Sequence, residues 1–129
     1  MKSGWILVAG VGALGIALQV AVAQGPAKSD TGAAPKVKYA DVQKVFTANC
    51  LGCHSGERAR GKIDLSSYDH VMKGGEDGPI VVAGNLRKSP LYMAVSHAQG
   101  FRPMPPSGTK LPDKDVATIQ QWIKDGAKK

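Results

Sequence analysis

The stretch Cys50-Leu51-Gly52-Cys53-His54 (CLGCH) decides how the rest of this sequence is interpreted. It contains both cysteines of the 129-residue chain, and a histidine directly follows the second. Cysteines at this spacing occur in four kinds of site: a structural zinc site, a redox-active dithiol, a local disulfide and a covalently attached haem. The surrounding sequence has to discriminate among these four.

Three of the four kinds of site find little support elsewhere in the chain. A structural zinc ion needs four ligands, and the other histidines, His70 and His97, stand in no ligand-spacing pattern. A thioredoxin-like dithiol follows a strand within a βαβ unit, whereas CLGCH follows a segment with helical periodicity. A disulfide between Cys50 and Cys53 would close a very short loop and would stabilise the fold little.

The pattern C-x-x-C-H is typical of covalent haem attachment. Residues three apart near a helix end lie on one face, so Cys50 and Cys53 can each reach a vinyl group on the same porphyrin edge. His54 can then turn its imidazole toward the iron. Aromatic residues make up only 5% of the chain, and a small domain with so few large side chains benefits from a cofactor at its centre. We therefore predict one covalent haem c with His54 as an axial ligand.

The second axial position of such an iron is either filled by a side chain or open for chemistry. The candidate ligands are Met72, Met93, Met104, His70 and His97. Met104 stands out because the prolines of Pro103-Met104-Pro105-Pro106 stiffen an extended loop around it. We predict Met104 as the distal ligand. A methionine raises the haem potential and closes the iron to small molecules, which suits electron transfer rather than catalysis.

The amino-terminal residues indicate export. Residues 4–23 carry no charge, follow Lys2 and end in Ala21-Val22-Ala23, which is typical of a secretory signal peptide cleaved after Ala23. An uncleaved membrane anchor is the alternative, because a bilayer span needs about 20 apolar residues. Residues 24–38 are rich in Gly, Pro, Ala and Lys and predict a flexible linker before a domain at 39–129. We expect the protein in the periplasm or otherwise outside the cytoplasm.

Apolar residues recur at the three- and four-residue steps of a helix in four segments, around residues 39–50, 63–75, 89–100 and 113–129. Ser66 or Ser67 can cap the second segment, and Ser89 can cap the third, with Pro90 at its first helical position. The apolar run 80–82 has no partner strand to pair with. The expected fold is all-α, with about four short helices around one haem.

Residues 41–127 resemble the planctomycete-type cytochrome c domain, within the small class I c-type cytochromes. The resemblance rests on CLGCH, GKIDLSSYDHVMKGGEDGPIVVAGNLRKSPLYMAV, MPP and LPDKDVATIQQWIKDGA, in this order. It implies an all-α cytochrome c-like fold, with Phe46 and Trp122 meeting where the first and last helices cross. It also implies that the second ring nitrogen of the proximal histidine donates to a backbone carbonyl in a Gly-Pro loop, for which Pro79 is the matching residue.

Composition and charge limit the class of partner. A net charge of +7 favours acidic partners, and no Lys/Arg block with interleaved aromatic residues indicates nucleic acid. Arg58, Arg60 and Lys62 follow CLGCH and either form a docking patch for an acidic partner or are simply a solvated basic loop. We expect a monomeric, exported monohaem carrier of single electrons between redox proteins, not an enzyme. The alternatives are a haem enzyme or sensor with an open sixth position, and a permanently docked haem subunit of a dehydrogenase or oxidase.

Overall fold

The helices lie where the apolar spacing of the sequence predicts them. The computed structural model describes residues 35–129, and its helical elements are α1 (Tyr39–Asn49), the 3-10 turn η1 (Arg60–Lys62), α2 (Tyr68–Lys73), α3 (Pro90–Val95) and α4 (Asp113–Lys124). Residues 35–129 contain no strand, only one isolated bridge between Gly75 and Gly78. The predicted all-α class with four short helices is therefore confirmed, and residues 80–82 belong to a loop.

The predictions for the amino-terminal segment fall largely outside this range. The signal peptide or membrane anchor at residues 1–23, and all but the last four residues of the linker at 24–38, lie outside the described residues. Among the helices of residues 35–129, none combines the length and the apolar character that crossing a membrane requires.

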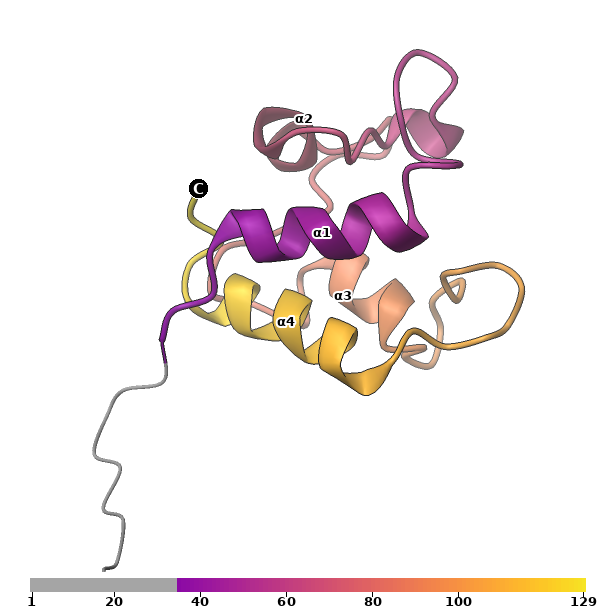
Figure 1. The fold of residues 1–129 in the computed structure, drawn as a ribbon. Coiled ribbons are helices and arrows are strands. Elements are labelled where there is room, and N and C mark those ends of the chain that lie inside the picture. The colour runs from indigo at the N-terminus through magenta and orange to yellow at the C-terminus, as the bar shows by residue number, and fades with distance from the viewer. Residues whose placement is uncertain (1–34) are drawn as a thin grey trace, which may run out of the picture. The chain divides into compact units, whose positions relative to one another are not determined.

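Helix α4 connects the other parts of the helical core. It packs against both α1 and α3, and Figure 1 shows α1 and α4 side by side, running in opposite directions. Their facing surfaces are apolar because both helices repeat large hydrophobic residues at helical spacing. The side chains that these two helices bury include Val42, Val45, Phe46, Val116, Ile119, Trp122 and Ile123.

Phe46 and Trp122 are the two largest side chains with no exposed surface, so both are core residues as predicted. Both side chains belong to one cluster of buried residues, and their helices α1 and α4 pack against each other. The rings around Trp122 are those of Tyr39 and Tyr68, with centroids 5.7 Å and 6.5 Å away. This arrangement arises because α2 brings Tyr68 against the start of α1, and edge-on contacts between aromatic rings are favourable.

Two serines were expected to cap helices, and only one does so. Ser67 caps α2, since its side chain accepts a hydrogen bond from the backbone N–H of His70 at 3.3 Å. Ser89 occupies the N-cap position of α3 but makes no capping bond. Its fully buried hydroxyl instead accepts from Val82 N at 2.9 Å and donates to Asn85 O at 2.7 Å. Ser89 therefore fastens the 82–85 loop to the start of α3.

Replacing Ser89 with alanine should lower the free energy of unfolding by about 1–3 kcal/mol, because the N–H of Val82 loses its side-chain partner in a partly buried setting. Denaturant titration of the purified protein measures the change. Ser107→Ala is the matched control, since Ser107 is exposed. A Ser89→Ala protein as stable as the Ser107→Ala protein would show that the buried hydroxyl contributes nothing.

Candidate haem-binding site

A cavity of about 320 Å³ opens beside the carboxyl end of α1. The loop that contains CLGCH and the loop between α3 and α4 both leave the helices at this end of α1 (Figure 1). The cavity is lined by Asn49, Cys50, Cys53, His54, Arg60, Gly61, Ile63, Val95, Arg102, Met104, Pro105, Pro106 and Leu111. The structure thus brings Cys50, Cys53, His54 and Met104 to one cavity, although Met104 lies far from the others in the sequence.

CLGCH extends the carboxyl end of α1 by one tight turn. The N–H groups of Cys53 and His54 both donate to the carbonyl of Cys50, at 3.0 Å and 2.9 Å. This turn puts both thiols and the imidazole into the lining of the cavity. Cys50 is half-buried and Cys53 is exposed, and the two are not joined in a disulfide. Burial raises the pKa of the Cys50 thiol to about 11, so this thiol is protonated at neutral pH.

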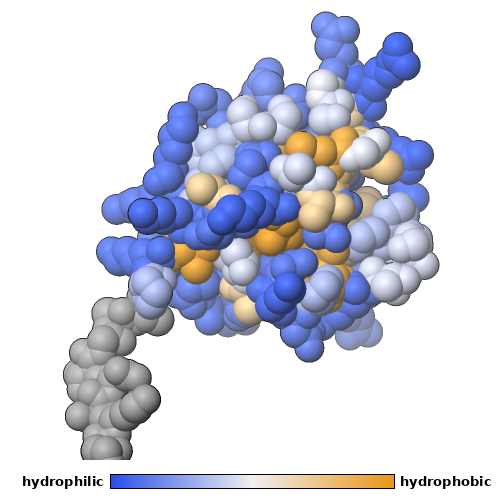
Figure 2. Space-filling model, viewed as in Figure 1, coloured by the Kyte–Doolittle hydropathy of each residue, from blue (hydrophilic) through white to orange (hydrophobic). Residues whose placement is uncertain are grey.

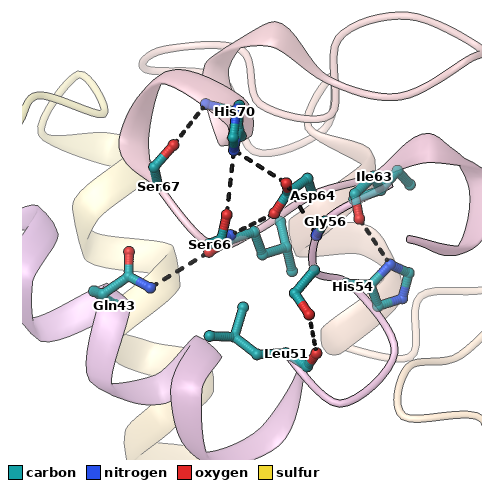
Figure 3. Close-up of polar contacts among 11 residues, drawn as sticks. Gln43, Leu51, His54, Gly56, Ile63, Asp64, Ser66, Ser67 and His70 are labelled. Carbon is teal, nitrogen blue, oxygen red and sulfur yellow. Dashed lines mark hydrogen bonds and ion pairs between the residues drawn. The ribbon is translucent and has the colours of Figure 1, made fainter. Parts of the chain in front are cut away.

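The imidazole of His54 is oriented by the backbone of the segment after η1. Its Nδ1 lies 3.2 Å from the carbonyl oxygen of Ile63 (Figure 3). A carbonyl can only accept, so Nδ1 carries the hydrogen and Nε2 keeps its lone pair. The N–H of Leu65 also donates to the carbonyl of His54 at 2.9 Å. The ring is therefore held with a nitrogen that can bind a metal ion.

The carbonyl of Ile63 replaces the one expected near Pro79, which corrects that prediction. The Gly74–Pro79 loop instead packs closely against Ile63, the residue whose carbonyl accepts from His54. A Cβ added to Gly75 would lie 2.6 Å from Cγ1 of Ile63 and 2.7 Å from the carbonyl oxygen of Gly61. The N–H of Glu76 donates to that same Gly61 oxygen at 3.0 Å. Only a glycine at position 75 allows the loop to approach so closely.

Met104 is held to the carboxyl end of α3 through its backbone. Its N–H donates to the carbonyl of Ala94 at 3.1 Å, and Nε2 of His97 lies 3.3 Å from its carbonyl oxygen. His97 adopts a φ of 58°, which is uncommon for a residue other than glycine. The other candidate ligands, Met72, Met93, His70 and His97, do not line the cavity. Met104 is the one methionine of its lining.

One family match covers CLGCH, helices α2 and α3 and most of the loop between α3 and α4. Residues 50–108 match the model of a family described as Planctomycete cytochrome C. The chain contains a planctomycete-type cytochrome c domain. Its identity implies covalently bound haem c, which agrees with the C-x-x-C-H pattern. The matched residues include CLGCH, the acceptor Ile63 and Met104. Comparison with curated proteins and with solved structures found no match to the chain.

The residues of this cytochrome c domain fit a haem c. Side chains with no polar atoms line much of the cavity, namely Ile63, Val95, Pro105, Pro106 and Leu111, and these suit the faces of a porphyrin. The fully charged side chains of the lining are Arg60 and Arg102, and haem c carries two carboxylates of opposite charge. Among residues 35–129, no group of three or more His, Cys, Asp and Glu side chains is placed to bind a free metal ion.

The close approach of Gly75 predicts a difference between two glycine variants of the domain. Gly75→Ala should lower the free energy of unfolding by about 1–3 kcal/mol, because the new methyl group overlaps Ile63 and the backbone of Gly61. Gly52→Ala should cost much less, since a Cβ there meets nothing within 4 Å. Denaturant titration of both proteins checks this, and equal stabilities would contradict the packing described for the Gly74–Pro79 loop.

Proposed function

We propose that this chain is an exported carrier of single electrons with one haem c, attached at Cys50 and Cys53 and ligated by His54 and Met104. The observation that supports the proposal most strongly is the common cavity of these four side chains. When bound, the iron of a haem c accepts and releases one electron. The residues of the chain attach the haem, orient it and set its potential.

The two cysteines fix the cofactor to the end of α1. Each thiol would hold the haem through a thioether: its S–H bond would break, an S–C bond would form to one vinyl carbon, and the hydrogen would go to the other vinyl carbon. The reaction needs no oxidant, provided that the cysteines are reduced thiols. The N–H groups of Cys53 and His54 both donate to the carbonyl of Cys50, and this short turn holds the two cysteines at a fixed separation. Attachment therefore requires little further ordering of this segment.

His54 supplies the proximal ligand through Nε2. Its Nδ1–H donates to Ile63 O, and such a bond fixes the ring and makes the imidazole a stronger electron donor. Met104 supplies the distal ligand from a loop tied to Ala94 and His97. Two ligands on loops that are already held by backbone hydrogen bonds change their positions little between oxidation states. A site of this kind favours fast electron transfer and leaves no open position for a substrate.

The partners proposed for this carrier are one-electron donor and acceptor proteins with acidic docking surfaces. Arg58, Arg60 and Lys62 are exposed, and Arg60 lines the cavity together with Arg102. These side chains place positive charge beside the cavity, and this charge would raise the rate of encounter with acidic partners at low ionic strength. We propose that the carrier acts as a monomer, binds no nucleic acid and meets a membrane only if its leader stays uncleaved.

Two observations bear on the alternatives of a haem enzyme or sensor and of a permanently docked subunit. Met104 in the cavity lining favours a closed sixth position over the open one that an enzyme or sensor needs. A permanent interface would require a substantial apolar patch. Within residues 35–129, Phe101 is the one large hydrophobic residue that is exposed. Figure 2 shows one mostly hydrophilic face, on which hydrophobic residues reach the surface in a narrow, interrupted band.

The optical spectrum of the oxidised protein tests the function. The wild type should show a weak far-red band from methionine bound to ferric iron, and Met104→Ala should abolish it. The same variant should bind cyanide at least about tenfold more tightly, a difference of about 1.4 kcal/mol, because no ligand has to be displaced. Met93→Ala is the matched control, since Met93 is also half-buried but does not line the cavity.

A high-spin ferric spectrum of the wild type would overturn the proposal of an electron carrier. So would a wild-type protein that binds cyanide as tightly as the Met104→Ala protein. Either result would favour the enzyme or sensor with an open sixth position.

A further inference from the structure

The segment Ile63-Asp64-Leu65 binds the loop around His54 at three consecutive residues. The carbonyl of Ile63 accepts from His54 Nδ1, and the N–H of Leu65 donates to His54 O. Asp64 is the member that acts through its side chain, because its Oδ2 accepts from the N–H of Gly56 at 3.1 Å. Figure 3 shows Asp64 between Gly56 on one side and the start of α2 on the other.

The carboxylate of Asp64 is occupied on both oxygens. Oδ1 accepts from the N–H of Ser66 at 2.9 Å, while Oδ2 accepts from Gly56 N and lies 3.1 Å from Nδ1 of His70. The side chain is only 18% exposed. Hydrogen bonding from Ser66 is the largest of the effects that lower the pKa of Asp64, and the nearby His70 and Gly56 act in the same direction. Asp64 is therefore ionised at neutral pH and connects the Gly56 backbone with the side chain of His70 in α2.

This cluster is not a catalytic Ser-His-Asp arrangement. In such a triad the serine and the aspartate contact opposite nitrogens of the imidazole. Here the hydroxyl of Ser66 and the carboxylate of Asp64 both approach Nδ1 of His70, at 3.2 Å and 3.1 Å. A proton could not pass from the hydroxyl through the ring to the carboxylate. The cluster is better explained by what it holds in place.

We propose that Asp64 is a positioning residue for the proximal ligand His54, an inference that rests on the function proposed above. By holding Gly56 against the 63–65 segment, the carboxylate sets the distance between His54 and its acceptor Ile63. That distance is 3.2 Å, at the long end of the range for a good N–H···O bond. A displacement of the loop by a few tenths of an ångström would therefore weaken it. Gly56, at a φ of 65°, has no side chain that could restrain the loop instead.

The strength of the hydrogen bond from His54 to Ile63 affects the reduction potential of the iron. A weaker bond at Nδ1 makes the imidazole a poorer electron donor, and this destabilises the ferric form more than the ferrous form. The reduction potential should then rise. Loss of a negative charge near the iron shifts the potential in the same direction, so the experiment must separate charge from position.

Three variants of the haem-loaded protein make that separation. Asp64→Asn removes the charge and weakens the bonds, Asp64→Glu keeps the charge but displaces the oxygens, and Glu57→Gln removes a charge beside Gly56 without any hydrogen bond to the loop. The direct readout is the solvent-exchange rate of the His54 Nδ1 proton, measured by NMR in the reduced state. We expect exchange at least about tenfold faster than in the wild type for both Asp64 variants, and an unchanged rate for Glu57→Gln.

The reduction potential and the haem content complete the test. The potential should rise more in Asp64→Asn than in Glu57→Gln, while the covalent haem content stays at the wild-type level. If Asp64→Asn does not accumulate as folded protein, Asp64→Glu decides through its exchange rate. Wild-type exchange in an Asp64 variant that folds would overturn the role of Asp64 and leave the electron carrier intact. A wild type without covalent haem would overturn the electron carrier itself.

Discussion

The hydrogen bond from His54 Nδ1 to the carbonyl of Ile63 is the interaction on which the rest of the site depends. It selects which nitrogen of the imidazole keeps a lone pair and in which direction that nitrogen points. Other features of the chain keep the acceptor in place: the bond between Leu65 and His54, and the close approach of Gly75 behind Ile63. The anchor for all of them is α1, because CLGCH continues directly from its last turn.

The two halves of the cavity depend on one shared support. Helix α1 presents the cysteines and His54, whereas the loop with Met104 is fastened to α3 through Ala94. Helix α4 packs against both helices, and its Ile119 and Trp122 have no exposed surface. A change in how α4 packs would therefore alter the distance between the two proposed axial ligands. A haem between them would act as a core element as well as a redox centre, as expected for a domain with so few large side chains.

Sequence patterns could predict those parts of the molecule that are specified by side chains. The four helices follow from apolar spacing, and CLGCH and the proline-flanked Met104 follow from residue types with known chemistry. What could not be predicted is specified by backbone atoms or by tertiary packing. The acceptor at Ile63 is a backbone carbonyl, a group that every residue has. The sequence therefore could not show that His54 would bond to Ile63 rather than to the loop at Pro79. The sequence predicts Ser89 as an N-cap, but its buried hydroxyl bonds to the 82–85 loop instead. Trp122 contacts Tyr39 and Tyr68 because α2 packs against α1, and the spacing of apolar residues within a helix does not predict such a contact between helices.

The proposed electron carrier requires a covalent bond between this chain and one haem, and intact-mass spectrometry measures that bond directly. The exported protein would be treated with acidified acetone, which extracts haem held only by coordination, and then weighed. The expected result is a single species that exceeds the polypeptide by the mass of one haem. Recovery of the bare polypeptide, with the haem in the acetone phase, would contradict it.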